Sequence, residues 1–479
     1  MNFAVLPKTF HSNLGESLKI KKGGYSMFER VFKLSEHKTT VKTEVMAGIT
    51  TFMTMAYILA VNPSVLGSTG MDTTAVLLAT ALASCLGTLC MAFMANLPFA
   101  LSAGMGLNAF MAYTVVAGYG YSWQVALLAV FIEGLIFIVL SLTNVREAIF
   151  NAIPLTLKKG VSVGIGLFIA FIGLQNSGLC VDSATLVGII SFPENFHTAG
   201  ICALLTLIGL FFTAVFYTRK MKGAILYGIL LTWILGMLCQ VTGLYVPTPD
   251  AGFYSLFPSW GMTDFSKLGL TFGQCFNVDF SAVGIVNFIV VIFSFLFVDI
   301  FDTLGTLIGV ATKAKMLDKD GKLPGIKPAL LADSIATSAG AILGTSTTTT
   351  FVESASGVAV GGRTGLTALV TGILFLVSTL FAPIFTAIPS FATAPALIMV
   401  GFLMVGTVTE INFDLDNLTE SIPAYLAIIA MPLFYSISEG ISLGVISYVL
   451  LNVAAGKGKK VAPLMYVLAV LFVLKYIFL

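Results

Sequence analysis

Charged side chains are scarce in this chain: Asp, Glu, Lys and Arg make up only 10% of its 479 residues, against about 25% in an ordinary soluble protein. Hydrophobic residues make up 57%. A soluble fold could not bury that much apolar surface, so lipid must solvate most of it. The net charge of +2 is too small to indicate a nucleic-acid partner. The composition therefore predicts an integral membrane protein.

Residues that hold metals or act as nucleophiles are also sparse. The three histidines, His11, His37 and His197, are scattered, and the six cysteines have no metal-ligand spacing. Residues 1–40 are polar and basic, with no cleavable signal peptide. Because no metal motif and no nucleophile beside a base stands out, the sequence argues against a membrane-embedded enzyme and predicts no cofactor.

Apolar runs long enough to span a bilayer recur along the whole chain. The fourteen runs lie near 43–62, 74–96, 101–118, 122–142, 158–176, 198–218, 222–243, 284–311, 329–345, 346–361, 364–383, 392–409, 419–437 and 439–455. A final apolar run, 462–479, is either a fifteenth span or an interfacial helix. Alternate connections, such as 219–222 and 457–460, are rich in Lys and Arg. This asymmetry predicts a multi-pass protein of the plasma (bacterial inner) membrane with a cytoplasmic N-terminus.

The two halves of the chain resemble each other. The segment IFNAIP at 149–154 matches IFTAIP at 384–389, and each follows the fourth span of its half. Seven spans are an odd number, so the two halves must insert with opposite orientations. We therefore predict an all-α membrane fold of about fourteen helices arranged as a 7+7 inverted repeat, an architecture of many secondary transporters.

The third span of each half is interrupted. The first, at 98–108, contains Gly104 and Gly106, and the second, at 344–357, contains four consecutive threonines at 347–350. Because threonine favours extended backbone and glycine permits sharp turns, we predict a short extended segment leading into a half-helix in spans 3 and 10. Half-helix N-termini would present free N–H groups to a midplane site. The alternative is that these glycines only pack helices closely.

Two acids lie inside the eighth span. Asp299 and Asp302 are three residues apart, so they share a helix face with Thr303 and Thr306. Each acid costs about 2.5–3.5 kcal/mol at a helix centre, which is rarely kept for structure alone. Neighbouring carboxylates cannot easily both ionise in a low dielectric, so the pair should bind a proton. The alternative is a protonated pair that bonds only to the backbone.

Two glutamates extend this set of intramembrane acids. Glu353 follows the threonine run, where it either belongs to a binding site or closes a capping box with Thr350. Glu133 lies alone in the fourth span, and the sequence leaves open whether it is structural or functional.

With these motifs, the chain resembles the AzgA-like adenine/guanine/hypoxanthine permeases, a branch of the xanthine/uracil permease superfamily. The resemblance extends from about residue 27 to 479. It rests on AGITTFMTMAYIL at 47–59, GMGLNAF at 104–110, the stretch 299–306, and ESASG at 353–357.

The resemblance implies a core domain and a gate domain, each assembled from both halves. The implied segments are a cytoplasmic leader at 1–40, core at 41–142, gate at 143–243, an extracytoplasmic loop at 244–282, core at 283–383 and gate at 384–479.

The resemblance also implies which residues form the site. Asp299 and Glu353 look like the acids that hold a purine, and Asp302 looks like a coupling or site-ordering acid. All three are candidates for proton coupling. The other candidate substrate-binding residues are Asn108, Phe351, Ser354 and Gly106.

The implied function is proton-coupled uptake of purine nucleobases by alternating access, with guanine and hypoxanthine favoured over adenine. The proton is the coupling ion, and the partners are the purine and the lipid bilayer. The alternatives are an anion transporter of the same fold, against which the acids argue, and a passive channel. The sequence leaves open the purine preference, a homodimeric state, the order of binding, and whether residues 1–26 belong to the natural protein.

Overall fold

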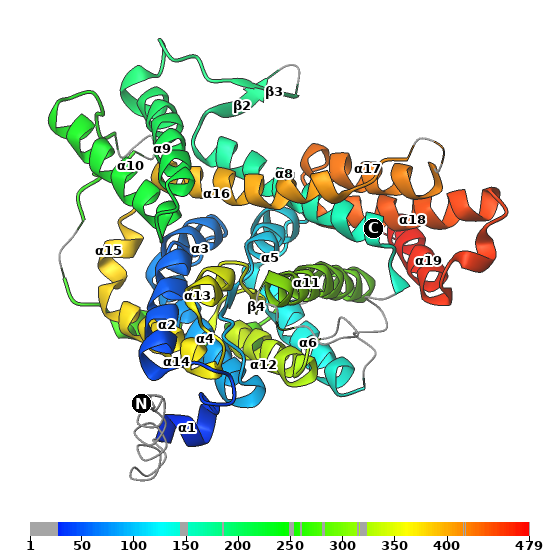
Figure 1. The fold of residues 1–479 in the computed structure, drawn as a ribbon. Coiled ribbons are helices and arrows are strands. Elements are labelled where there is room, and N and C mark those ends of the chain that lie inside the picture. Colours follow the sequence, from blue (N-terminus) through cyan, green and yellow to red (C-terminus); the bar gives the residue numbers. More distant parts are fainter. Residues whose placement is uncertain are drawn as a thin grey trace, which may run out of the picture.

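The computed structural model of this chain is almost entirely helical (Figure 1). It describes residues 27–143, 152–183, 186–248, 253–258, 261–279, 283–313, 316, 323–414, 416 and 418–478. Most of the predicted leader and part of the repeated segment 149–154 lie outside the described residues.

Ten of the described helices are long and apolar enough to cross a membrane. In chain order they are α2 (Val41–Met55) with α3 (Ile58–Gly67), α4 (Thr73–Cys90) with η1 (Met91–Ala95), α6 (Trp123–Leu142), α8 (Leu155–Asn176), η3 (Phe196–Gly200) with α9 (Ile201–Thr218), α10 (Ala224–Val241), α12 (Ile326–Leu343), α14 (Gly365–Ser378) with η7 (Thr379–Phe381) and α15 (Ala382–Thr386), α16 (Ser390–Val405) with η8 (Gly406–Glu410), and α18 (Ile437–Ala454).

The remaining elements complete the predicted set of spans. The other apolar helices are α5 (Met105–Ala109) with its π-helical continuation η2 (Phe110–Gly118), α11 (Ile285–Lys313), the half-helix α13 (Ser354–Val360), α17 (Leu418–Leu433) and α19 (Pro463–Phe478). The short elements are α1 (Met27–Phe32), the hairpin of β2 (Cys180–Ser183) and β3 (Leu186–Ile189), η5 (Phe265–Leu270), η6 (Gln274–Phe276) and η9 (Gly458–Lys460). Each of the fourteen predicted spans therefore has a counterpart among the described helices.

The helices form two layers (Figure 1). We call α2–α6 and α11–α14 the core layer, and α8–α10 with α16–α19 the gate layer. Inside the gate layer, α8 and α16 cross at two glycines: a Cβ on Gly401 would lie 2.4 Å from the carbonyl oxygen of Gly166. Small residues at such a crossing let helix backbones approach closely. That the two layers move against each other as core and gate domains stays a prediction.

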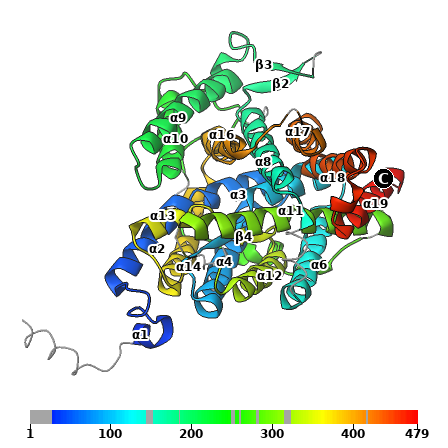
Figure 2. The ribbon, with the colours of Figure 1, turned by 45° about the vertical axis from the view of Figure 1, so that its right-hand side comes forward.

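Two short strands meet in the core layer, where Figure 2 labels one of them, β4 (Thr348–Thr350), near the centre. Strand β1 (Leu101–Ala103) pairs antiparallel with β4, with Ser102 opposite Thr349. Each strand leads into a half-helix, β1 into α5 and β4 into α13, which confirms the prediction for spans 3 and 10. The pairing joins the two halves of the chain, and it satisfies backbone groups that lipid could not.

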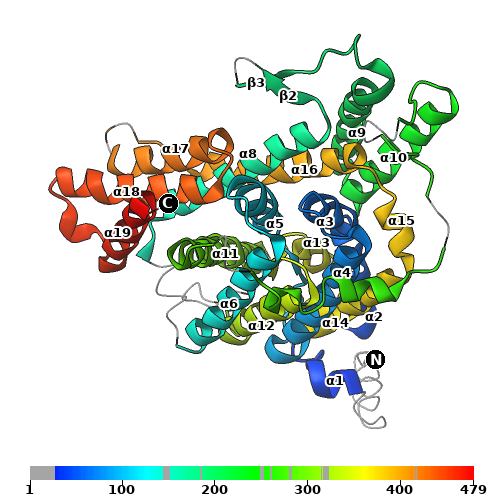
Figure 3. The ribbon, with the colours of Figure 1, turned by 180° about the vertical axis from the view of Figure 1, so that it is seen from behind.

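The C-terminal helix α19 runs antiparallel to α18 (Figure 3). Near its start, the Tyr466 hydroxyl donates to the carbonyl oxygen of Gly458 at 2.9 Å, in the α18–α19 connection. Near its end, Lys475 forms an ion pair with Glu439 in the first turn of α18. Sixteen residues give α19 a length of about 24 Å. It therefore lies along much of α18, but it is shorter than the helices that are long enough to cross a membrane, so the choice between a fifteenth span and an interfacial helix stays open.

Candidate functional site

The two acids of α11 are three residues apart, and Asp302 contacts the strand pair. Asp299 is fully buried and accepts a hydrogen bond from the Thr303 hydroxyl at 2.7 Å. Oδ2 of Asp302 lies 3.5 Å from the Thr349 hydroxyl of β4. It would also lie 3.1 Å from a Cβ at Gly104, which is closer than side chains normally pack. Asp302 is therefore held against the junction between β1 and α5, where glycine leaves room for it.

Glu353 lies at the N-cap of the other half-helix, α13. Its Oε1 accepts a hydrogen bond of 2.8 Å from the hydroxyl of Tyr57, at the start of α3. The described helix α13 begins without a side-chain capping bond, so the capping-box alternative is wrong. The carboxylate instead points to another helix of the core layer. A second contact from the same layer, 2.9 Å between the Thr54 and Ser356 hydroxyls, fixes the first turn of α13.

The two half-helices differ in the N–H groups they offer. In α13 the N–H groups of residues 354–356 donate to the carbonyls of residues 351–353 at 2.9–3.1 Å. The prediction of free N–H groups is therefore wrong for α13, because a tight turn uses them. In α5, Asn108 N–H donates to the Gly104 carbonyl at 2.8 Å. The preceding N–H groups at 105–107 thus belong to the first turn, which has no acceptors inside the helix.

The three candidate acids interact as one cluster. Asp302 interacts electrostatically with both Asp299 and Glu353, and Tyr57 interacts with Glu353 and Asp302. Carboxylates that share a low-dielectric site cannot all be ionised, and their protons come off as a coupled set. The cluster can therefore hold a proton and present hydrogen-bond acceptors at the same place.

The other candidate residues connect the segments around this cluster. Asn108 is fully buried and accepts a hydrogen bond from the Ser346 hydroxyl, just before β4. The Ser354 hydroxyl accepts the Ala100 N–H at 3.0 Å, and Phe351 is buried beside it. Gly106 faces the gate layer, since a Cβ there would lie 3.0 Å from Ile165 of α8. Asn108 and Ser354 thus tie the two halves together, and direct binding by these residues stays a prediction.

Two neighbours of the cluster were not selected from the sequence as site residues. Tyr57 lies within the motif at 47–59, and Asp333 lies in none of the motifs described above. Asp333 is fully buried on α12, with its two carboxylate oxygens 3.3 and 3.4 Å from the Thr303 hydroxyl. An acid within a helix of spanning length was the available signal. Glu133, left open by the sequence, is fully buried and accepts the Thr347 hydroxyl at 2.8 Å.

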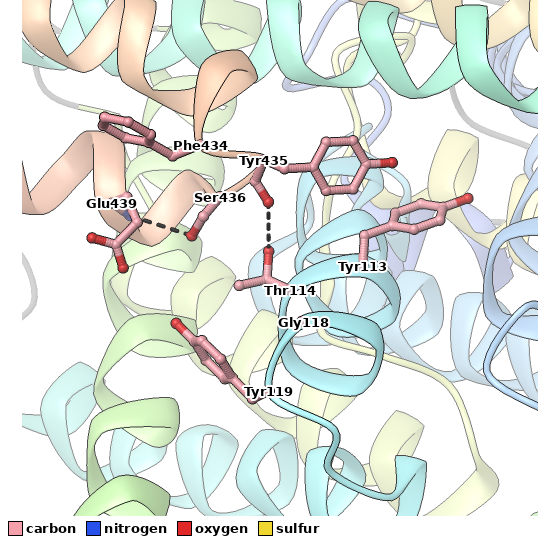
Figure 4. Close-up of a pocket in the computed structure, with 8 residues that line it drawn as sticks. All are labelled: Tyr113, Thr114, Gly118, Tyr119, Phe434, Tyr435, Ser436 and Glu439. Carbon is pink, nitrogen blue, oxygen red and sulfur yellow. Dashed lines mark hydrogen bonds between the residues drawn. The ribbon is translucent and has the colours of Figure 1, made fainter. Parts of the chain in front are cut away.

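A cavity of about 200 Å³ lies where the two layers meet, beyond the C-terminal end of α5 (Figure 4). It is lined by Tyr113, Thr114, Gly118 and Tyr119 of the core layer and by Phe434, Tyr435, Ser436 and Glu439 of the gate layer. Hydrogen bonds cross between the layers here: the Thr114 hydroxyl donates to the Tyr435 carbonyl at 3.3 Å, and the Asn176 side chain of α8 lies 3.0 Å from the Tyr113 hydroxyl. The acids Asp299 and Glu353 are not among the residues that line this cavity.

The bond from Tyr57 to Glu353 leads to a prediction. Tyr57→Phe removes the hydroxyl but keeps the buried ring. A hydrogen bond to a charged group contributes about 1.5–3 kcal/mol, so transport efficiency (kcat/KM) should fall about 10-fold or more. Initial-rate measurements over a range of substrate concentrations would test this. Tyr254→Phe, at an exposed tyrosine, is the matched control. Unchanged efficiency in Tyr57→Phe would show that the hydroxyl does not support the site.

Sequence comparison places the chain among known transporters. Residues 42–473 match the Permease family model Xan_ur_permease. The guanine/hypoxanthine permease PbuG of Bacillus subtilis is 46% identical over 458 residues, covering 94% of this chain and 99% of the relative. The adenine permease AdeP of Escherichia coli is 42% identical over 459 residues, covering 95% and 97%.

Solved structures share the fold at low sequence identity. The transmembrane domain of the cyanobacterial bicarbonate transporter BicA aligns with a TM-score of 0.58 and 16% identity, covering 84% of this chain and 97% of that domain. The murine anion transporter Slc26a9 in its inward-facing state also gives a TM-score of 0.58, at 13% identity, covering 95% and 77%. These likenesses confirm that the chain shares its fold with these two proteins, and they extend no further than the fold.

Proposed function

Because this chain belongs to the Permease family, we propose that it carries purine nucleobases across the membrane together with protons. The relatives named as guanine/hypoxanthine and adenine permeases cover nearly the whole chain and support the substrate class. The acid cluster supports the coupling ion. Guanine and hypoxanthine remain the favoured purines, with adenine as the alternative.

The observation that carries the proposal is the cluster of Asp299, Asp302 and Glu353 beside the paired strands. A purine is flat and neutral, with ring N–H donors next to nitrogen and oxygen acceptors. Carboxylates can accept its N–H groups, and the first turn of α5 can donate to its acceptors. A base that left one of these buried groups unpaired would be bound much more weakly, which gives the site its selectivity.

Coupling follows from the same groups. Protonation of one acid lowers the repulsion within the cluster and frees another carboxylate to bind the purine. A proton and a purine that bind together would favour one orientation of the core layer against the gate layer, so both ligands cross the membrane in one cycle. The basic connections support a cytoplasmic N-terminus for this cycle in the plasma membrane.

The anion alternative rests on the fold that the chain shares with BicA and Slc26a9. An anion would have to bind beside three carboxylates, and like charges at close range repel strongly in a low dielectric. The site chemistry therefore favours a neutral heterocycle.

Uptake of radiolabelled hypoxanthine tests the proposal. We expect cells that lack their own purine permeases, and that express this chain, to take up the label in a protonophore-sensitive manner. Excess guanine or adenine should compete, whereas uracil should not. If the protein reaches the membrane and uptake stays at the empty-vector level, the purine assignment is wrong. Uptake that is insensitive to the protonophore, with an internal hypoxanthine concentration that never exceeds the external one, would instead indicate a passive channel.

A further inference from the structure

One hydroxyl group lies between two buried acids that come from different helices. The Thr303 hydroxyl is 2.7 Å from Oδ1 of Asp299 on its own helix α11. It is 3.3 Å from Oδ2 and 3.4 Å from Oδ1 of Asp333 on α12. Asp299, Thr303 and Asp333 are all buried without measurable exposure. The hydroxyl therefore bridges an acid of the candidate site to an acid outside it.

The number of protons available to this bridge decides which acid can accept a hydrogen bond and which must donate one. A threonine hydroxyl has one proton to donate, and its oxygen can accept others. It can donate to one carboxylate, and a second acid can make a favourable bond to the same oxygen only by donating its own proton. The shorter distance, to Asp299, marks the acceptor in this conformation. The arrangement is thus a hydrogen-bonded chain that can carry one proton between Asp299 and Asp333.

The transfer conserves atoms and charge. When Asp299 holds the proton and the Thr303 hydroxyl donates to Asp333, the Asp299 O–H bond breaks as its proton bonds to the Thr303 oxygen, and the original Thr303 O–H bond breaks as that proton bonds to Asp333. The threonine ends as a neutral hydroxyl, Asp299 as a carboxylate and Asp333 as a carboxylic acid. Rotation of the Thr303 hydroxyl then resets the chain.

The position of Asp333 gives the transfer a direction. Asp333 is the eighth residue of α12, so it lies about 11 Å along the helix from its start at Ile326. The basic connection before α12 predicts that this end faces the cytoplasm. Among the described residues, the other acids on the elements that pack near the bridge are Asp302 on α11, Glu353 at α13 and Glu133 on α6, which packs against α12. Asp302 and Glu353 belong to the candidate site. Glu133 accepts a hydrogen bond from the hydroxyl of Thr347, the residue just before β4.

We propose that Asp333 receives the coupled proton from Asp299 through the Thr303 hydroxyl and passes it toward the cytoplasmic side. The inference rests on the proposed function, since it assigns a proton route to that same site. Thr303 and Asp333 do not hold the purine in this scheme. Their loss should therefore separate proton coupling from substrate translocation.

Purified protein in liposomes allows that separation to be measured. Exchange of labelled for unlabelled hypoxanthine needs binding and reorientation of the loaded carrier, but no net proton movement. Accumulation needs both. With the membrane potential clamped at zero, a pH gradient of about one unit can drive about tenfold accumulation if one proton accompanies each purine.

The variants have distinct expected outcomes. Thr303→Val, which keeps the shape but not the hydroxyl, should still exchange hypoxanthine, at a rate lowered by the loss of the bond to Asp299, and should accumulate none above equilibrium. Asp333→Asn should also exchange without accumulating, and it provides the test if Thr303→Val does not fold. Thr303→Ser, which retains the hydroxyl, should accumulate like the wild type.

Other outcomes would overturn the relay. Accumulation by Thr303→Val or Asp333→Asn at the wild-type level would show that the proton takes another path. Loss of accumulation in Thr303→Ser would show that the methyl group, and hence packing, is what matters. A wild-type protein that exchanges hypoxanthine but does not accumulate it would overturn proton coupling itself, and the relay with it.

Discussion

Glu353→Gln and Asp299→Asn should each reduce purine uptake by about a hundredfold. Each change replaces a carboxylate that can accept two N–H bonds with an amide whose NH2 group opposes a purine donor. Loss of a hydrogen bond to a charged group removes up to about 3 kcal/mol, which corresponds to about a hundredfold in binding. Both variants keep the size of the side chain, so membrane insertion should be unaffected.

Labelled hypoxanthine uptake, normalised to the amount of protein in the membrane, checks this expectation. The matched controls are Glu194→Gln and Asp416→Asn, which make the same chemical changes at exposed positions. They should transport normally. If both site variants also transported normally, the cluster of Asp299 and Glu353 would not be the binding site.

Lys475→Met should strongly destabilise the folded protein. Lys475 lies in an apolar helix with only 4% of its side chain exposed, paired with Glu439, and its ammonium group also donates to the Ser438 hydroxyl at 3.0 Å. Removing one partner of a buried ion pair typically costs about 3–5 kcal/mol, because the remaining charge is left without compensation. Glu439 is 22% exposed and keeps a hydrogen bond from Tyr476, so we expect the lower end, about 3 kcal/mol.

Thermal unfolding of the detergent-solubilised protein measures this loss. The double variant with Glu439→Gln and Lys475→Met removes both charges, and it should recover most of the lost stability. If the double variant were less stable than Lys475→Met alone, Glu439 would be stabilised by groups other than Lys475. Lys459→Met, at an exposed position in the α18–α19 connection, is the control for the loss of a lysine.

Local sequence signals predicted the main architecture. A run of β-branched threonines followed by small residues predicts extended backbone and then a turn wherever it occurs, so β4 and the interruption before α13 could be predicted. Asp299 and Asp302 could likewise be predicted to share a helix face, because residues three apart in a helix lie on the same side. The register that places Ser102 opposite Thr349 could not be predicted, because it joins residues from the two halves of the chain.

The missed residues depend on tertiary contacts in the same way. Thr350 and Glu353 have the spacing of a capping box, yet a tyrosine hydroxyl from α3 binds Glu353 instead. Asp333 lies among alanines and serines, so its stretch of the sequence is less apolar and a single acid there is a weak signal. Its significance depends on the Thr303 hydroxyl of another helix. Sequence patterns identify which acids are costly to bury, whereas packing decides which partners they find.

The pairing of β1 with β4 also constrains how such a protein could arise and be divided. Each strand is three residues long, and the two strands belong to different halves of the chain. Among the described residues, each strand pairs with the other. One half expressed alone would bring unpaired N–H and C=O groups into the bilayer, each costing several kcal/mol. An ancestral single half would therefore have had to dimerise. Two fragments cut between α10 and α11 should likewise accumulate only when a cell makes both.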